Sequence, residues 1–338
     1  MQPVFLVGPT AVGKSAVAME LARLIGMDSS AKASAKAEIA SADSMQVYRG
    51  MDIGTAKATA SERRRIRHHL IDVCEVNQPF DVKRFVDLAT KTLADIQARG
   101  NTPLIVGGTG LYLRALRHGL FEGPPRDEKL RAKLEMMSAE TLFAELQRID
   151  PQTAGTIDRH NPRRLVRALE VFYLTGKPIS ELQIQWTTNH RGKNAAPTKS
   201  GSTAPTARGS DISFGKLRTG SVATGICLNR DREDLYLRIE RRIDEQIAAG
   251  WVEEVKRLLA DGLEKNATAM QAAGYRELVA HLRGELTLTE AVALIKTRTR
   301  QLARRQLTWF RREPDLEWIE IKQDELPETT AQRILKKL

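Results

Sequence analysis

One segment near the N-terminus has the residue types and spacing that bind polyphosphates. Residues 8–15 read Gly-Pro-Thr-Ala-Val-Gly-Lys-Ser, which fits the pattern G-x-x-x-x-G-K-[ST] in full. The glycines let backbone N–H groups converge on phosphate oxygens, and the helix that follows adds a partial positive charge. Lys14 would neutralise the terminal phosphates, and the Ser15 hydroxyl would help to hold Mg²⁺. The predicted diphosphate-binding residues are Gly8, Thr10, Ala11, Val12, Gly13, Lys14 and Ser15.

The loop lies between a strand pattern and a helix pattern, as this motif requires. Residues 4–7 form an apolar run typical of a buried parallel strand, and apolar residues from 15 to 25 recur at helical spacing. Further short apolar runs, each followed by a loop or a helical pattern, lie at 39–40, 70–73, 104–106 and 225–228. This alternation predicts an α/β fold: a P-loop NTPase-like parallel sheet flanked by helices.

A long stretch without strand patterns interrupts this alternation. Residues 127–182 read as successive helices, one of them opened by Asn161 and Pro162. We therefore expect an all-helical insertion over 123–222, within a core made of 1–122 and 223–338. Two segments, 28–36 and 187–221, are low in complexity, and the second is expected to be a flexible basic loop.

The composition limits the class of protein and the class of partner. The 338 residues include 53 Lys and Arg against 42 Asp and Glu, a net charge of +11 that permits an anionic partner such as nucleic acid. Cys74 and Cys227 lie far apart and suit neither a disulfide framework nor a zinc cluster, so a reducing, cytoplasmic setting is expected. No apolar run reaches the roughly 18 residues of a membrane span, so no membrane association is expected.

Six further blocks have a more specific pattern. They are residues 39–57 (IASADSMQVYRGMDIGTAK), 68–72 (HHLID), 103–112 (PLIVGGTGLY), 163–170 (RRLVRALE), 274–278 (GYREL) and 299–310 (TRQLARRQLTWF). In this order they resemble the bacterial tRNA dimethylallyltransferases, also called tRNA isopentenyltransferases, over nearly the whole chain. The resemblance implies transfer of a dimethylallyl group from dimethylallyl diphosphate to N6 of the adenosine 3′ to the anticodon, with release of diphosphate. It implies Mg²⁺ as cofactor and a tRNA anticodon stem-loop as partner, and we expect a monomer.

Three residues match reacting groups of that family. Asp43 matches the general base, which would take a proton from the adenine amine as it attacks the allylic carbon. Composition alone would make Asp43 a turn residue, because its neighbours are typical of turns. Thr109 matches a residue near the diphosphate and the reacting amine, and Arg238 matches one at the pyrophosphate. Arg242 shares a helix face with Arg238, and we expect it on a solvated basic surface.

Two basic segments suit an RNA backbone. Residues 296–313 hold seven Lys and Arg against one acid, and arginine binds phosphates while an aromatic side chain such as Trp309 stacks on unpaired bases. Arg163, Arg164 and Arg167 fall on one side of a predicted helix. The resemblance places tRNA contacts at Asp43, Ser44, Met45, Gln46, Arg163, Arg164, Leu165, Val166, Arg167, Gly274, Tyr275, Arg276, Arg304, Arg305, Gln306, Trp309 and Arg311.

Three other functions use some of the same features. A phosphoryl-transfer kinase has the same loop, but it has no need of the basic helical insertion. A non-catalytic RNA-binding module would tolerate the loss of the Asp43 carboxylate. An enzyme that prenylates free adenine nucleotides would not need the two basic segments.

Overall fold

The computed structural model describes the chain in four ranges, 2–27, 36–120, 123–182 and 224–338. Most of the predicted low-complexity segment 28–36, and all of 187–221, lie outside the described residues. The chain forms two compact units: Met1–Leu116 with Leu217–Leu338, here called the core unit, and Arg117–Lys216, here called the helical unit.

The core unit is built on a six-stranded sheet. Its strands are β1 (Val4–Val7), β2 (Ala37–Ser41), β3 (His68–His69), β4 (Thr102–Gly107), β5 (Gly225–Arg230) and β6 (Leu316–Ile321). They lie in the order β3-β2-β4-β1-β5-β6, and every neighbouring pair is parallel. The α/β parallel fold predicted from the sequence is confirmed. The carboxyl ends of β1, β2 and β4 therefore meet at one edge of the sheet, where ligands bind in folds of this kind.

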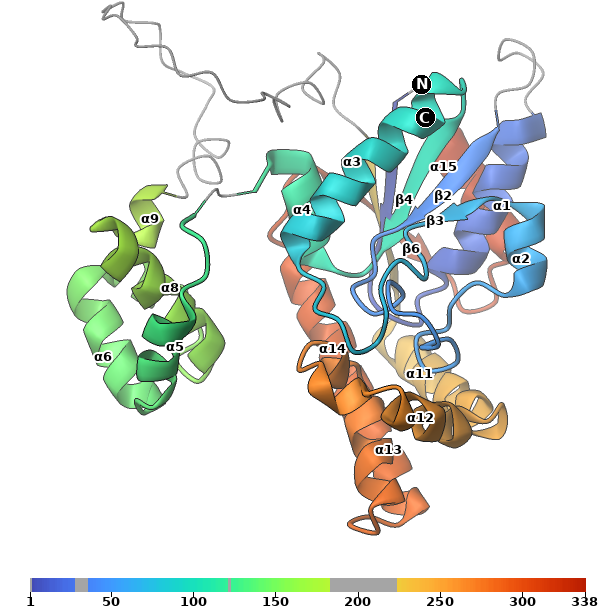
Figure 1. The fold of residues 1–338 in the computed structure, drawn as a ribbon. Helices are drawn as coiled ribbons and strands as arrows, with labels where there is room; N and C mark the ends of the chain where they lie inside the picture. The colour runs from blue at the N-terminus through green and yellow to red at the C-terminus, as the bar shows by residue number, and fades with distance from the viewer. Residues whose placement is uncertain (1, 28–35, 121–122, 183–223) are drawn as a thin grey trace, which may run out of the picture. The chain divides into compact units, whose positions relative to one another are not determined.

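Helices cover both faces of the sheet (Figure 1). Helix α1 (Lys14–Met27) packs beside α15 (Pro327–Leu335) on one face, and α3 (Val82–Ala98) lies on the other. The remaining helices of this unit are α2 (Ala60–Arg65), α4 (Gly110–His118), α11 (Arg232–Ala248), α12 (Trp251–Ala260), α13 (Tyr275–Leu282) and α14 (Leu288–Phe310). Helix α4 continues two residues past the end of the core unit. The short 3-10 helices are η3 (Leu263–Lys265) and η4 (Ala269–Gln271).

Two parts of the sheet differ from the sequence prediction. The strand expected at 70–73 is wrong: β3 consists of His68 and His69, and the chain then turns, with positive φ at Leu70 (62°) and Asp72 (57°). Backbone hydrogen bonds from Asp72 to Gln46 at 3.2 Å and from Val73 to Val47 at 2.8 Å hold this run instead. Strand β6 at the opposite edge was not predicted, because the two glutamates in its sequence LEWIEI interrupt the apolar run that marks a buried parallel strand.

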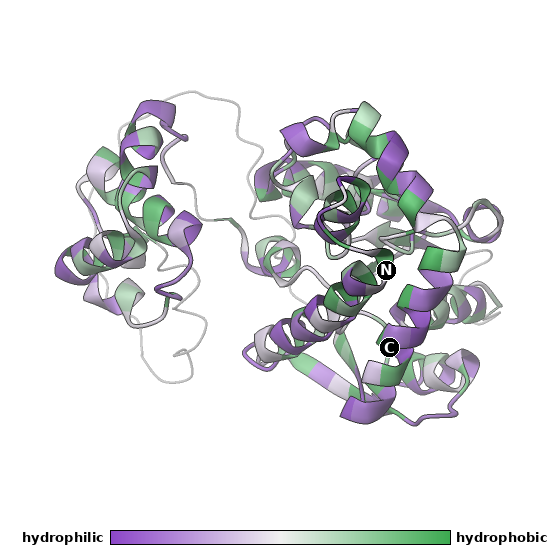
Figure 2. Cartoon of the chain, turned by 90° about the horizontal axis from the view of Figure 1, so that it is seen from below, coloured by the Kyte–Doolittle hydropathy of each residue, from purple (hydrophilic) through white to green (hydrophobic). Residues whose placement is uncertain are grey.

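Burial follows the layers. All four residues of β1 are buried, as are all five of β2 and all six of β4. In Figure 2 the helices show green and purple along the same element, as expected when one face is buried and the other exposed. In the four described ranges no helix is both long and apolar enough to cross a bilayer.

The helical unit contains short helices around a core of its own. They are α5 (Glu128–Glu135), α6 (Ala139–Ile149), α7 (Pro151–Ala154), α8 (Pro162–Thr175) and α9 (Ile179–Leu182). Asn161 accepts a hydrogen bond from the Arg164 N–H at the start of α8, and Pro162 occupies its first position. Gly176 ends α8 in the left-handed conformation with φ of 69°. Leu134, Leu142, Leu146, Leu165 and Leu169 pack together as the core.

Candidate active site

The predicted phosphate-binding loop joins the end of β1 to the start of α1. Gly8 has φ of 148°, and a Cβ atom there would lie 2.7 Å from the carbonyl oxygen of Leu228. Gly13 has φ of 105°, and Ala11 adopts the left-handed conformation at 63° although it is not glycine. Such a backbone persists only where its surroundings hold it.

Cationic side chains hold the loop by its carbonyl oxygens. Lys14 Nζ donates to Gly8 at 3.0 Å and to Pro9 at 2.7 Å. Arg238 Nε donates to the carbonyl of Ala11 at 3.2 Å. Arg230 Nε, in β5, donates to that of Val12 at 2.9 Å. The loop is therefore pre-organised by positive charge, which favours an anionic ligand.

The electrostatics of Lys14 follow from its position inside this loop. Burial lowers the pKa of Lys14 to about 8, against the attraction of Asp43 and together with the repulsion of Arg242. Binding of an anion would stabilise the charged form and raise this pKa again. An anionic ligand beside Lys14 would therefore be stabilised by the lysine charge.

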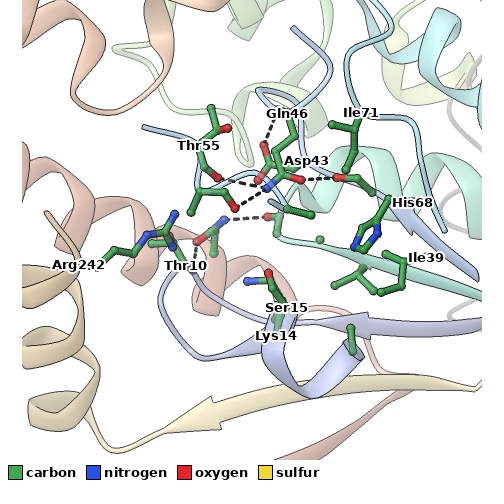
Figure 3. A pocket seen from close by; sticks show the side chains of 18 residues that line it. Thr10, Lys14, Ser15, Ile39, Asp43, Gln46, Thr55, His68, Ile71 and Arg242 are labelled. Carbon is green, nitrogen blue, oxygen red and sulfur yellow. Dashed lines mark hydrogen bonds between the residues drawn. The ribbon is translucent and has the colours of Figure 1, made fainter. Parts of the chain in front are cut away.

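A single pocket extends from the loop along the carboxyl edge of the sheet. In Figure 3 Asp43 and Gln46 lie across this pocket from Lys14 and Ser15, and Arg242 lies at one end of it. The opposite end is formed by Ile39, His68 and Ile71, with Ala18, Ala58 and Val106 also in the wall. The pocket thus joins an anion-binding end to a largely apolar one.

Asp43 follows β2 and lines the pocket. Its Oδ1 accepts hydrogen bonds from the backbone N–H groups of Met45 at 2.8 Å and Gln46 at 3.4 Å, which is the turn role expected from composition. Among the described residues no hydrogen bond reaches Oδ2. One carboxylate oxygen therefore fixes the side chain, while the other is available to a ligand.

Thr109 holds the turn that carries Asp43. Its Oγ1 accepts a hydrogen bond from the Ser44 N–H at 3.0 Å, and its own N–H donates to the carbonyl of Ala42 at 3.3 Å. At Gly107, two residues before Thr109, a Cβ atom would lie 2.2 Å from the carbonyl oxygen of Ala42. The ends of β2 and β4 therefore approach closely, and only glycine permits this.

Helix α11 brings two arginines to the loop. Arg238 is exposed and contacts Ala11 as described, whereas Arg242 lines the pocket and places Nη1 3.4 Å from Thr10 Oγ1. Burial lowers the pKa of Arg242, and the attraction of Asp43 opposes this shift. The expectation that Arg242 lies on a solvated surface is wrong, because α11 turns this side chain toward the phosphate loop.

Comparison with known proteins decides the family. The model of the family described as IPP transferase matches residues 46–313 of the chain. The chain belongs to the IPP transferase family. The resemblance inferred from the sequence blocks is thereby confirmed.

Relatives of this IPP transferase align along nearly their whole length. It is 43% identical over 325 residues to the tRNA dimethylallyltransferase 1 of Trichlorobacter lovleyi, covering 94% of each chain. It is also 43% identical to the tRNA dimethylallyltransferase of Geobacter metallireducens, over 94% of this chain and 92% of the relative. The solved tRNA isopentenylpyrophosphate transferase of Bacillus halodurans is 35% identical with a TM-score of 0.65, covering 99% of this chain and 96% of that one.

The basic segment on helix α14 contains exposed arginines and a glutamine that points into the protein. Arg304, Arg305 and Arg311 are exposed, so they are free to meet a polyanion. Gln306 instead points inward: its Oε1 accepts from the Thr10 N–H at 2.8 Å, and it lines the pocket. Gln306, a residue expected at tRNA, therefore lies against the predicted phosphate-binding loop.

Trp309 is packed against α4 rather than displayed for stacking. A Cβ atom on Gly110 would lie 2.2 Å from the indole nitrogen, and the Arg114 guanidinium lies over the ring at 4.5 Å. The indole N–H is buried and has no hydrogen-bond partner among the described residues. Trp309 is partly buried in this position, and stacking of its ring on an unpaired base stays a prediction.

The block at 274–276 has two buried residues and one exposed residue. Tyr275 is fully buried and donates to Glu254 Oε1 at 2.7 Å, and burial together with Glu254 raises its pKa well above the usual value. Gly274 lies against the ring of Trp251, where a Cβ atom would come within 2.1 Å. Of the three residues only Arg276 is exposed, so it is the one whose side chain is accessible to tRNA.

Helix α8 of the helical unit also has both exposed and buried residues among those expected at tRNA. Arg163 and Arg164 are exposed and accessible to RNA, whereas the side chains of Leu165 and Val166 are buried in the core of this unit. Arg167 is half-buried and pairs with Glu170. Burial raises the pKa of Glu170, but hydrogen bonds from Arg131 and Arg167 outweigh this and bring it to about 2.

Proposed function

We propose that this protein transfers a dimethylallyl group from dimethylallyl diphosphate to N6 of the adenosine 3′ to the anticodon in tRNA, giving N6-dimethylallyladenosine and diphosphate. The observation that carries this proposal is one pocket with an anion-binding loop on one side and the Asp43 carboxylate on the other. The names of the relatives, tRNA dimethylallyltransferases, support the same activity.

The loop side suits a diphosphate leaving group. Lys14 and Arg242 line the pocket, and Arg238 lies at the loop, so fixed positive charge faces the oxygens on which negative charge develops. Ser15 also lines the pocket, beside Lys14. No cluster of three or more His, Cys, Asp or Glu that could hold a metal occurs within the described ranges.

Ser15 and the phosphate loop fit a bound Mg²⁺, because this ion takes few protein ligands and is held mainly by substrate phosphates and water. Ser15 would supply a hydroxyl ligand at the loop. When bound, the ion would neutralise negative charge on the diphosphate oxygens.

The other side suits an amine acceptor. As N6 of adenine attacks the allylic carbon, a C–N bond forms, the C–O bond to diphosphate breaks, and a proton leaves the amine. Asp43 Oδ2 would receive that proton, while Oδ1 stays on the N–H groups of Met45 and Gln46. Thr109 acts by holding this turn.

The exposed arginines of both units suit the RNA backbone. In the core unit these are Arg276, Arg304, Arg305 and Arg311, and in the helical unit Arg163 and Arg164. Because a stacked adenine cannot enter the pocket, the base must leave its stack to reach Asp43.

The test is to incubate the protein with Mg²⁺, dimethylallyl diphosphate and an unmodified tRNA that has adenosine 3′ to the anticodon. Nucleoside mass spectrometry should show N6-dimethylallyladenosine, and a tRNA with guanosine at that position should gain nothing. Replacing tRNA with AMP tests prenylation of free nucleotides, and replacing the donor with ATP tests kinase activity. Absence of any prenylated nucleoside from the adenosine-containing tRNA overturns the proposal.

A further inference from the structure

A turn in the pocket wall is held from behind by one buried carboxylate. The successive backbone N–H groups of Asp52, Ile53 and Gly54 donate to the Glu254 carboxylate at 2.9, 2.6 and 3.2 Å. Three consecutive amides converging on one anion resemble the nests by which backbones bind anionic ligands. Here the anion belongs to the protein itself, from helix α12, about 200 residues further along the chain.

Glu254 has no cationic partner among the described residues, although it is only 1% exposed. Its fourth hydrogen bond comes from the Tyr275 hydroxyl at 2.7 Å. A buried carboxylate without a counter-ion is costly unless its oxygens are fully hydrogen-bonded. The four donors therefore satisfy the charge, and removing the carboxylate would leave three amides unpaired.

The turn has little room to move. The Trp251 ring packs so closely on Gly54 that a Cβ atom there would lie 2.2 Å from the indole nitrogen. Gln246, in α11, donates to the carbonyl of Ile53. Two residues after Gly54, Ala56 adopts the left-handed conformation with φ of 46°, which a non-glycine residue keeps only under constraint.

The front of the same turn forms the acceptor side of the pocket. Thr55 and Ala56 line it, and their carbonyl oxygens accept from Gln46 Nε2 at 3.1 and 3.4 Å. The N–H of Gln46 in turn donates to Asp43 Oδ1. Glu254 is thus connected to the carboxylate proposed as the base by hydrogen bonds at both ends of the turn, joined through the backbone of the turn and through Gln46.

We propose that Glu254 is a positioning residue, which fixes the acceptor side of the pocket for the adenine through the turn at 52–56. This inference rests on the proposed function. The diphosphate side is held independently, because Arg230, Arg238 and Gln306 contact the phosphate loop directly. Loss of the Glu254 charge should therefore impair use of the tRNA acceptor and spare binding of pyrophosphate.

The test compares E254Q with two matched variants. E38Q makes the same change at another buried carboxylate, which is held by Arg99 and Asn101 and does not line the pocket. E253Q makes the same glutamate-to-glutamine change at Glu253, which precedes Glu254 and is exposed. We expect E254Q to lower kcat/KM for tRNA at least tenfold more than E38Q does, and pyrophosphate Kd to stay within about twofold of wild type. E253Q should behave as wild type.

Two outcomes overturn the inference: tRNA kinetics in E254Q that match those of E38Q at equal loss of Tm, or a parallel loss of pyrophosphate affinity. Amide hydrogen exchange adds a readout that does not need activity, because exchange at 52–56 should accelerate in E254Q and not in E253Q or E38Q. If wild type transfers no prenyl group, the proposed function fails. The exchange result then still decides whether Glu254 fixes the turn.

Discussion

Gln306 of α14 accepts a hydrogen bond from the backbone N–H of Thr10 at 2.8 Å, although 296 residues separate them in the sequence. Its Nε2 donates to the carbonyl of Gly108 at 3.0 Å, so one amide side chain joins the phosphate loop to the turn after β4. The exposed Arg304 and Arg305 precede it on the same helix. Helix α14 therefore contributes to the phosphate-loop side of the pocket as well as to the exposed basic surface.

Replacing Gln306 with alanine should weaken pyrophosphate binding. The change removes both hydrogen bonds by which Gln306 joins the loop to the turn after β4. At about 1 kcal/mol each they contribute about 2 kcal/mol together, so we expect Kd to rise by up to about thirtyfold. Calorimetric titration with pyrophosphate measures this. Gln301→Ala, at an exposed position of the same helix, is the control. If only the KM for tRNA changes in Gln306→Ala, the residue serves RNA and not the loop.

Replacing Arg242 with glutamine should slow prenyl transfer at least tenfold. Arg242 lines the pocket at Thr10, and a fixed cation there opposes the charge that develops on the leaving diphosphate. Steady-state transfer to tRNA gives the rate. The neighbouring Arg241 is exposed and pairs with Glu245, so Arg241→Gln should retain full activity. Equal rates in the two variants would contradict a role for Arg242 in the pocket.

Replacing Asp43 with asparagine should lower the rate of transfer by about 10²- to 10⁴-fold, the usual contribution of a general base. The asparagine carbonyl still accepts from Met45 and Gln46, so the turn and the binding of tRNA and pyrophosphate should persist. Asp43→Ala loses the turn bonds too and should also lower Tm. Transfer by Asp43→Asn within tenfold of wild type would leave Asp43 as a turn residue only.

Binding of the diphosphate donor should take up a proton at alkaline pH. The pKa of Lys14 is about 8 in the ligand-free loop, and an anion raises it. At about pH 7 Lys14 is already mostly charged, so uptake is near zero. At about pH 9 Lys14 without an anionic partner is mostly neutral, and uptake on binding approaches one proton. Affinity should therefore fall by up to tenfold per pH unit above about pH 8.

Calorimetry of dimethylallyl diphosphate binding in buffers of different ionisation enthalpy measures this uptake. Lys14→Arg is the control, since its guanidinium keeps its charge at every pH used. Uptake that is the same at both pH values, or that persists in Lys14→Arg, would show that another group titrates.

The basic residues of α8 should separate into RNA contacts and structural ones. The double change of Arg163 and Arg164 to alanine should weaken tRNA binding. The slope of log K for binding against log salt concentration should fall in magnitude by about 2. The Tm should not change, because both side chains are exposed. Arg167→Ala should lower stability by about 1–3 kcal/mol, because Glu170 is buried and loses one of its partners. Filter binding and thermal unfolding measure the two effects. An unchanged salt slope in the double variant would remove α8 from the RNA surface.

The sequence alone was sufficient for the phosphate loop and the class of fold. The loop is contiguous, so Gly8, Gly13 and Lys14 are brought together by local backbone geometry that the motif itself encodes. The alternation of apolar runs with helical patterns likewise reports local periodicity. This periodicity wrongly predicted a strand at 70–73, because the chain turns at Leu70 and Asp72, where φ is positive.

The tertiary structure decided which side of each helix faces the pocket. Arg238 and Arg242 share one helix face by spacing, yet only Arg242 lines the pocket, and Gln306 meets a loop 296 residues away. The roles of Tyr275 and Glu254 likewise depend on where α12 and α13 pack. Helical periodicity shows that two side chains share a face, but which face meets the sheet edge is set by packing between distant segments. A contact across hundreds of residues leaves no local pattern to read.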